Sequence, residues 1–339
     1  MTGPQAPAYR PAPDQLAVIA ARYGLGPLAA WRELAGGVVN PVLLLNERGV
    51  LRINVRTPDD PRVAKEAWVL ARLAGEPPPL SVRVPAVLGA DTRRTILPYD
   101  YLLLDFLPGR RGGEVWEGGS AAERADLSRQ LGAILARLHA QPLPGMDYGG
   151  WNPATGALGT YADWRALIAA WAARKLAEIA ELGIMPAAQL AGVRAWLTAH
   201  AEAVPAAARR VLTHGDFGLW NTMLAPGPAG HGWTITAVFD FEWAQAGPPA
   251  LDFVPILYDA ADPLDPVAFL AAYSGGAPLD PGLLCETHYY QMLYHLDLLG
   301  VVHRHWGGQG GGAHEAGIAR LLAGVPIPGF AAAGYGWPF

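Results

Sequence analysis

The sequence predicts an α+β protein with two lobes, a small antiparallel sheet followed by a larger and mainly helical part. Short apolar runs separated by turn residues fill the first hundred residues, whereas the apolar spacing from Ser120 onward is mostly that of amphipathic helices. A short strand-rich island at 211–239 interrupts the helices. We therefore expect an N-terminal lobe over 1–107, a C-terminal lobe over 108–339, and a ligand cleft between them.

The first lobe is expected to hold two helices, one from Asp14 to Arg22 and an amphipathic one over 62–74. The residues Glu47-Arg48-Gly49 separate two apolar runs and indicate a hairpin turn. The expected strands are 31–34, 42–46, 50–55, 84–88 and 101–106.

The second lobe is expected to contain long helices on either side of the island. These helices are 121–140, 161–182, 187–203, about 250–259, 265–273 and 281–304. The strands of the island are 211–213, 222–224 and 233–239. The Gly-rich stretch at 307–312 and the last six residues indicate a docked or frayed tail.

Composition excludes several classes of protein. Of the 339 residues, 51% are hydrophobic and 16% charged, which argues against disorder over most of the length. The net charge of -5 argues against a nucleic-acid partner held by phosphate contacts. No apolar run reaches the roughly 18 residues that a membrane span needs, and the Pro- and Ala-rich start does not resemble a signal peptide. The lone Cys285 favours a reducing cytoplasm, so we expect a cytoplasmic protein.

The sharpest chemical signal is the segment His214-Gly215-Asp216-Phe217-Gly218-Leu219-Trp220-Asn221. It lies between two short apolar segments, which predicts a loop held at both ends. An aspartate at this place can accept the proton of a substrate hydroxyl, and an asparagine five residues later can offer its amide oxygen to Mg²⁺. The alternative is a polar loop in which Asp216 only caps a turn.

A second segment, Val238-Phe239-Asp240-Phe241-Glu242, ends an apolar strand with two acids spaced by one residue. In an extended strand, Asp240 and Glu242 share a face, so both carboxylates can point at one ion. Together with the first segment they form a set of hard oxygen ligands. Such a set favours Mg²⁺, which usually binds together with a polyphosphate.

The two segments together resemble the aminoglycoside phosphotransferase family, which also includes choline, homoserine, macrolide and methylthioribose kinases. Weaker likenesses are the glycine-containing stretch 34–40, the Leu-His end of 131–139 and the stretch 247–252, so the resemblance covers roughly 30–305. It implies the bilobed protein-kinase-like fold, ATP or GTP as phosphate donor, Mg²⁺ as cofactor, and a small molecule whose hydroxyl accepts the phosphate.

The resemblance also implies roles for single residues. In the catalytic loop, His214, Asp216 and Asn221 form the catalytic set, with Asp216 as base. Asn221 and Asp240 become magnesium ligands, and Glu242 holds a second ion or a bridging water. At the nucleotide, the implied residues are Gly36, Gly37 and Asn40 over the phosphates, Arg52 paired with Glu66, and Leu104 and Phe106 in a hinge spanning 102–107.

One departure from the family pattern concerns the third strand, which carries Arg52 and no lysine. Lys65 stands beside Glu66 on the expected helix and cannot be the strand residue. Arginine is always charged and forks onto phosphate oxygens, so we assign the phosphate clamp to Arg52 and predict its ion pair with Glu66. The alternative is that Arg52 faces outward from the strand. A second departure, Pro248 in place of an acid, leaves Asp252 to brace the catalytic loop.

Residues 213–303 contain ten acids and neither Lys nor Arg. A negative potential there favours a cationic acceptor such as an aminoglycoside-like antibiotic. The competing explanation is that these acids cap helices and face water. Other functions stay open: a metabolic kinase of choline, homoserine or a related alcohol, a module that modifies proteins, or a pseudokinase that binds nucleotide without turnover. We expect a monomer or homodimer without a nucleic-acid or membrane partner.

Overall fold

The computed structural model describes residues 9–34, 40–55, 60–75, 80–116, 118–141, 143, 146–228, 232–257 and 264–339. The chain forms two compact units. The first unit consists of Met1–Glu114, Trp151–Ala157 and Trp220–Ala244. The second consists of Val115–Gly150, Leu158–Leu219 and Gln245–Phe339. The boundary expected after Leu107 stays a prediction.

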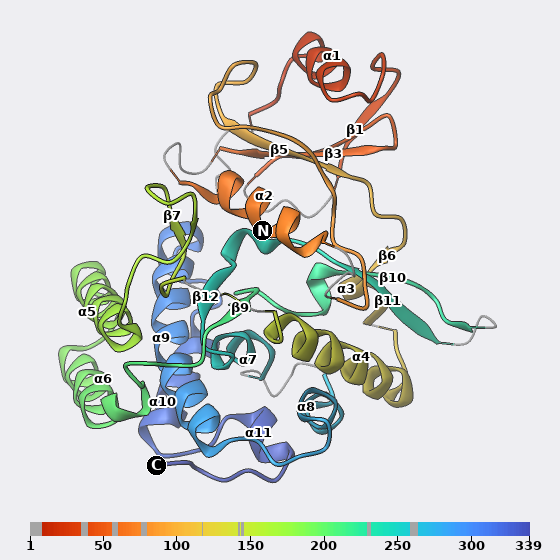
Figure 1. Ribbon diagram of the computed structural model, residues 1–339. Helices are drawn as coiled ribbons and strands as arrows, with labels where there is room; N and C mark the ends of the chain where they lie inside the picture. The colour runs from red at the N-terminus through yellow and green to blue at the C-terminus, as the bar shows by residue number, and fades with distance from the viewer. Residues whose placement is uncertain are drawn as a thin grey trace. The chain divides into compact units, whose positions relative to one another are not determined.

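The first unit contains a five-stranded antiparallel sheet with the strand order β1-β2-β3-β5-β4 (Figure 1). The strands are β1 (Trp31–Glu33), β2 (Val42–Leu45), β3 (Gly49–Asn54), β4 (Val87–Asp91) and β5 (Asp100–Asp105). The fourth strand begins three residues later than expected, because Pro85 has no N–H and Ala86 donates its own N–H to the Asp105 side chain.

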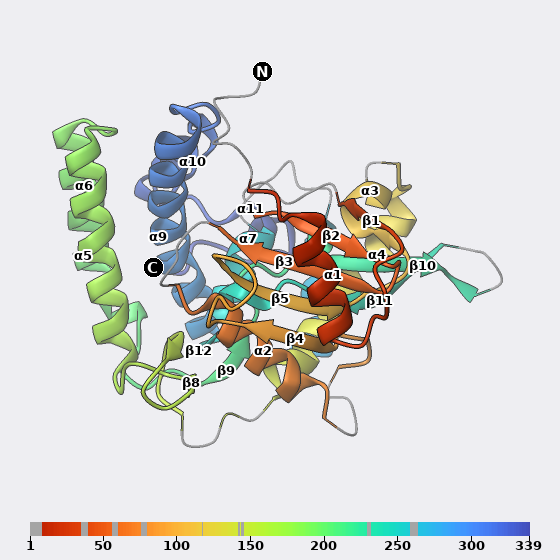
Figure 2. The same cartoon turned by 90° about the horizontal axis from the view of Figure 1, so that it is seen from above.

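Alternation along the strands gives this sheet two faces. Helix α1 (Pro13–Arg22) lies on one face, where Leu16 and Ile19 pack with Leu51, Ile53 and Leu103. Figures 1 and 2 show α1 crossing the strands on this face. Side chains alternate along a strand, so Arg52 points to the opposite face, the one that carries α2 (Arg62–Leu73).

The first unit also contains a three-stranded sheet in the order β11-β10-β6, built from β6 (Arg110–Arg111), β10 (Thr222–Pro226) and β11 (Trp233–Val238). Thr222 pairs with Val238 in the antiparallel register. The residue before β10, Asn221, therefore lies beside the residue after β11, and the N–H of Phe239 donates to the carbonyl of Asn221 at 3.0 Å. This register places Asn221 near the segment that carries Asp240.

The second unit is mainly helical. Its larger helices are α4 (Ala121–His139), α5 (Trp164–Leu182), α6 (Ala187–Ala199), α7 (Ala250–Leu257), α8 (Pro266–Ser274), α9 (Pro281–Trp306) and α10 (Gly312–Leu322). Its short elements include β9 (Val211–Thr213), β12 (Gln245–Gly247) and α11 (Pro328–Ala332). The short strand β7 (Trp151–Asn152) belongs to the first unit, and the boundary between the units falls within α3 (Gly112–Trp116) and β8 (Ala157–Leu158). Strand β9 pairs with β12 and leads directly into His214.

The long helices expected from periodicity are confirmed, whereas α10 and α11 were missed. The glycines at 307–312 obscured the helical spacing that starts again at Gly312. The tail is docked, since Phe339 packs on Trp196 and His200 with ring centroids 5.8 and 4.3 Å apart. Among the helices of the described ranges, none combines the length and the apolar character that crossing a bilayer takes.

Candidate functional site

In the first unit, Arg52 is the centre of a cluster of carboxylates. Its Nη1 lies 2.7 Å from Glu66 Oε1, and its Nη2 lies 2.8 Å from Asp240 Oδ1 and 3.1 Å from Glu242 Oε2. The ion pair predicted between Arg52 and Glu66 is therefore confirmed. The outward-facing alternative for Arg52 is wrong, because its side chain is only 19% exposed.

The protonation of this cluster follows from burial and charge. Burial by itself would lower the pKa of Arg52, but the three carboxylates outweigh it and raise that pKa, so the guanidinium stays charged. Burial raises the pKa of Glu66, although Arg52 opposes the shift. Glu66 Oε1 also accepts the N–H of Phe241 at 3.2 Å, which ties α2 to the residue after Asp240.

Asp240 has a backbone conformation that few residues adopt. It follows β11 with φ 71° and ψ 58°, in the left-handed region, and leads into the 3-10 turn Phe241–Trp243. The extended strand expected through Glu242 is therefore wrong, because β11 ends at Val238 and the chain turns at Asp240. Aspartate tolerates this region better than most non-glycine residues, and such conformations concentrate at functional sites. The side chain is 30% exposed, so its carboxylate is accessible to a ligand while Arg52 holds one oxygen.

Glu242 is bound on both carboxylate oxygens. Arg52 holds Oε2, and Arg62 on α2 approaches Oε1 at 3.4 Å. Arg62 also pairs with Asp60 at 2.5 Å, and its guanidinium lies 4.0 Å above the ring of Trp243. Sequence reasoning missed Arg62, because an arginine in the first turn of a helix gives no signal of a partner 180 residues away.

The neighbouring Lys65 is buried, with 9% of its surface exposed. Burial, together with the charge of nearby Arg62, lowers the pKa of its ammonium group to about 8. Lys65 therefore belongs to the same charged face of α2 and lies outside the sheet, as expected.

Two side chains of the first unit, Asp240 and Asn221, have oxygen atoms suited to Mg²⁺. Within the ranges that the structure describes, no three His, Cys, Asp or Glu side chains form a ready-made metal cage. Mg²⁺ needs no such cage, since it commonly binds one or two carboxylates together with substrate phosphates. Asp240 and the 4% exposed Asn221 offer hard oxygen atoms, whereas Glu242 is held by two arginines.

In the second unit, the loop after β9 is built around Asp252. This residue is 0% exposed, and its Oδ1 and Oδ2 accept the N–H groups of Gly215 at 2.7 Å and His214 at 2.8 Å. Gly215 has φ +81°, a conformation that glycine adopts without strain. The N–H of Asp216 donates to Nδ1 of the buried His214 at 3.3 Å. Asp252 thus holds the loop at His214 and Gly215, and the N–H of Asp216 is tied to His214 within the loop.

His139, the last residue of α4, is the third donor to Asp252, with Nε2 3.0 Å from Oδ2. Its Nδ1 lies 2.9 Å from the hydroxyl of Tyr273 on α8. In the sequence, the Leu-His end of this helix is only a likeness to the family and predicts no partner for His139. The 113 residues between His139 and Asp252 hide the contact from the sequence.

Of the other residues expected to bind the nucleotide, those that the structure describes lie at separate positions of the first unit. Gly36 and Gly37 lie outside the described residues. Asn40 Oδ1 accepts the N–H of Val55 at 3.2 Å. Leu104 is buried and, by alternation, shares its sheet face with Arg52, while the N–H of Phe106 donates to the carbonyl of Arg48 at 2.9 Å.

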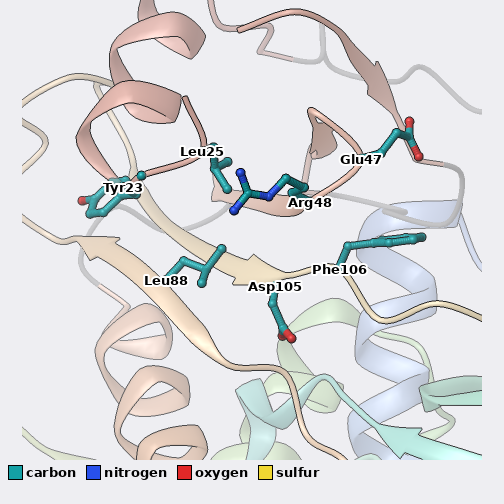
Figure 3. Close-up of a pocket in the computed structure, with 8 residues that line it drawn as sticks. Tyr23, Leu25, Glu47, Arg48, Leu88, Asp105 and Phe106 are labelled. Carbon is teal, nitrogen blue, oxygen red and sulfur yellow. The ribbon is translucent and has the colours of Figure 1, made fainter. Parts of the chain in front are cut away.

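A cavity of about 330 Å³ opens near the end of α1, beside Phe106 (Figure 3). It is lined by Tyr23, Gly24, Leu25, Glu47, Arg48, Leu88, Asp105 and Phe106. Leu25 belongs to the core under α1, on the sheet face opposite to Arg52. The cavity is therefore separate from the carboxylate cluster.

Several acids of the segment 213–303 have structural partners. Asp265 and Asp280 cap α8 and α9 by accepting backbone N–H groups. Asp297 pairs with Lys175, and Glu286 accepts the hydroxyl of Tyr290 at 3.1 Å. Two of the ten acids thus fit the helix-capping explanation and two others have side-chain partners, so the excess of acids by itself does not select a cationic acceptor.

The family model described as "Phosphotransferase enzyme family" matches residues 30–283, three quarters of the chain. The chain belongs to this family. The phosphotransferase is thus a small-molecule kinase, as the two motifs indicated. A comparison with curated proteins gives no match.

The family's kinase-like fold is confirmed by solved structures. A thermostable mutant of aminoglycoside phosphotransferase APH(4)-Ia has a TM-score of 0.67 at 19% identity, over 90% of this chain and 97% of that one. The GDP and kanamycin complex of APH(2")-IIIa has a TM-score of 0.63 at 17% identity, over 91% and 97%. Macrolide 2'-phosphotransferase MphH from Brachybacterium faecium has a TM-score of 0.56 at 26% identity, over 91% and 98%.

Proposed function

We propose that this phosphotransferase moves the γ-phosphate of ATP or GTP to a hydroxyl of a small antibiotic-like molecule, in the cytoplasm. The observation that carries the proposal is the cluster of Arg52, Glu66 and Asp240 on the α2 face of the sheet. A charged arginine beside an accessible carboxylate can bind phosphate oxygens and a divalent ion together. Solved structures of similar fold include complexes with GDP, ATP or ADP.

Each residue then has a role. Arg52 binds phosphate oxygens of the donor, and Glu66 holds its guanidinium in place. Asp240 and Asn221 would hold Mg²⁺, which neutralises phosphate charge when bound. Glu242 positions Arg52 and becomes a ligand of a second ion only if both arginines release it.

In the second unit, Asp216 accepts the proton of the acceptor hydroxyl as the phosphoryl group leaves the nucleotide. His214 acts through its ring nitrogen, which accepts the N–H of Asp216, and is therefore a positioning residue. Asp252 holds the same loop through the N–H groups of His214 and Gly215.

Two acceptor classes have support from the comparisons. Neighbours of similar fold are complexes with kanamycin, streptomycin or gentamicin, which makes an aminoglycoside-like amino sugar the first candidate. A macrolide is the second, because the macrolide 2'-phosphotransferase has the higher identity of 26%. Phosphorylation of choline or homoserine, or nucleotide binding without catalysis as in a pseudokinase, would rule out both of these acceptor classes.

A transfer screen with purified protein tests the proposal. Kanamycin, gentamicin, a macrolide, choline and homoserine are each offered with ATP and with GTP, and phosphorylated product is detected by mass spectrometry. We expect product from an amino-sugar antibiotic or a macrolide. Nucleotide binding without any product, and without hydrolysis above the level of the matched Asp216→Asn variant, would instead identify a pseudokinase.

The Asp216→Asn variant is also a prediction. It removes the proton acceptor but keeps the shape of the side chain, so we expect turnover to fall by about 10²–10⁴-fold. The melting temperature and the nucleotide Kd should stay unchanged, because the N–H of Asp216 still donates to His214. A near-normal kcat together with a lowered melting temperature would show that Asp216 only stabilises the turn.

A further inference from the structure

A row of hydrogen bonds runs from α8 to the loop of Asp216 within the second unit. It joins the Tyr273 hydroxyl to His139, His139 to Asp252, and Asp252 to the backbone of the loop. We propose that Tyr273 is a positioning residue that fixes the tautomer and orientation of His139, and through Asp252 the placement of Asp216. The kinetic part of this proposal rests on the role of Asp216 as base.

The direction of the hydrogen bonds follows from Asp252. Its carboxylate is 0% exposed and can only accept, so each of its three partners must be a donor. His214 and Gly215 supply backbone N–H groups. His139 must therefore carry a proton on Nε2, the atom that lies 3.0 Å from Oδ2.

The other ring nitrogen of His139 determines whether this tautomer is stable. In a neutral imidazole with a proton on Nε2, Nδ1 is an acceptor and needs a donor. The Tyr273 hydroxyl, 2.9 Å away, is that donor. Burial raises the pKa of Tyr273 to about 12, so the hydroxyl keeps its proton at neutral pH. The opposite tautomer would turn a lone pair of Nε2 toward the Asp252 carboxylate.

Close packing of α4 and α8 brings the two side chains together. A Cβ at Gly132 on α4 would lie 2.2 Å from the carbonyl oxygen of Phe269 on α8, so only glycine allows this approach. Tyr273 lies one turn after Phe269 on α8. Its ring contacts Phe253 edge to face at a centroid distance of 4.8 Å, which limits its rotation. The hydroxyl is thus held in place by the helix crossing.

Removing the hydroxyl leaves Nδ1 of His139 without this donor in a side chain that is 1% exposed. The ring can then rotate or change tautomer, and the carboxylate of Asp252 loses a fixed donor. Because the same carboxylate holds the His214 and Gly215 N–H groups, these amides should open more often. Asp216, the proposed base, directly follows Gly215 in the sequence, so opening of these amides would displace it.

The test compares Tyr273→Phe with a matched control, Tyr290→Phe. Tyr290 is also buried, and its hydroxyl accepts from Trp164 at 2.7 Å and donates to Glu286 at 3.1 Å. Both variants lose one buried hydroxyl in the second unit. Only Tyr273 is connected to the loop of Asp216 by the contacts described above.

Two readouts need no substrate. Proton–nitrogen correlation spectra of histidine-labelled protein report the tautomer, with the His139 signals assigned from a His139→Gln variant. We expect the Nε2–H tautomer in the parent protein and a changed or mixed state in Tyr273→Phe. Hydrogen exchange of the His214 and Gly215 amides should become about 10-fold faster in Tyr273→Phe, and stay within twofold of the parent in Tyr290→Phe.

The third readout is kinetic. With any acceptor that the protein phosphorylates, Tyr273→Phe should lower kcat by about 5–20-fold with the nucleotide KM unchanged. Unchanged tautomer and amide exchange in Tyr273→Phe would overturn the proposal. Equal loss of kcat in both variants would also overturn it, since that loss reflects packing alone. Altered exchange in a protein that phosphorylates no acceptor would support the proposal while contradicting the proposed function.

Discussion

Replacing Arg52 by methionine tests the electrostatic reasoning about the carboxylate cluster most directly. Methionine keeps an unbranched stem but leaves Glu66, whose side chain is 4% exposed, without its cation. Removing one partner of a buried ion pair typically costs about 3–5 kcal/mol. Asp240 and Glu242 contribute less, because they are more exposed at 30% and 17% and Glu242 keeps Arg62.

Protonation of Glu66 limits the loss. An unfolded glutamate has a pKa of about 4.3, so placing a proton on it at a pH about three units higher costs about 4 kcal/mol. We therefore expect Arg52→Met to lower the free energy of unfolding by about 3 kcal/mol near neutral pH. Burial raises the pKa of Glu66 in the fold, so the variant regains stability as the pH falls toward the pKa of the unfolded chain.

Urea unfolding followed by tryptophan fluorescence measures this loss at pH about 7.3 and at pH about 5.3. The loss should shrink by about 1–3 kcal/mol at the lower pH. In a double variant with Glu66→Gln, most of the stability should return at neutral pH, because no buried charge is left unpaired. A loss below about 0.5 kcal/mol in Arg52→Met, or no recovery in the double variant, would refute the reasoning.

Two further variants test the contacts of α2 and a buried histidine. Arg62→Met removes the cation above Trp243 and one of the two cations that hold Glu242, so calorimetry should show about 3–10-fold weaker binding of magnesium nucleotide. An unchanged Kd would count against Arg62 as a positioning residue. Burial lowers the pKa of His288 to about 4, and its Nε2 accepts the N–H of Ile327, so the fold needs the neutral ring. The neutral ring of His288 therefore stabilises the fold above pH about 6.5, and up to about 3 kcal/mol of unfolding free energy is lost as the pH falls toward about 4. Between these pH values, His288→Gln should lose less unfolding free energy than the parent protein by about that amount. Equal losses in the parent and in this variant would exclude the histidine as the cause.

The sequence by itself determined those parts of the site that depend on local spacing. The five-residue step from Asp216 to Asn221 places both side chains in the segment between β9 and β10, and the two-residue step from Asp240 to Glu242 places both acids just after β11. The turn that brings both acids to Arg52 was not readable from that spacing. Periodicity likewise gave the strands and the long helices, because a strand or helix with one buried face needs apolar residues at a regular step.

Only the tertiary structure decided which partners these side chains have. Arg62 meets Glu242 across 180 residues, and His139 meets Asp252 across 113. Such pairs depend on how helices and sheets pack, and packing leaves no regular spacing in the sequence. The acids after 213 show the same limit: a charge count cannot tell Asp280, which caps a helix, from Asp240, which is held by Arg52, because the two differ only in their neighbours in space.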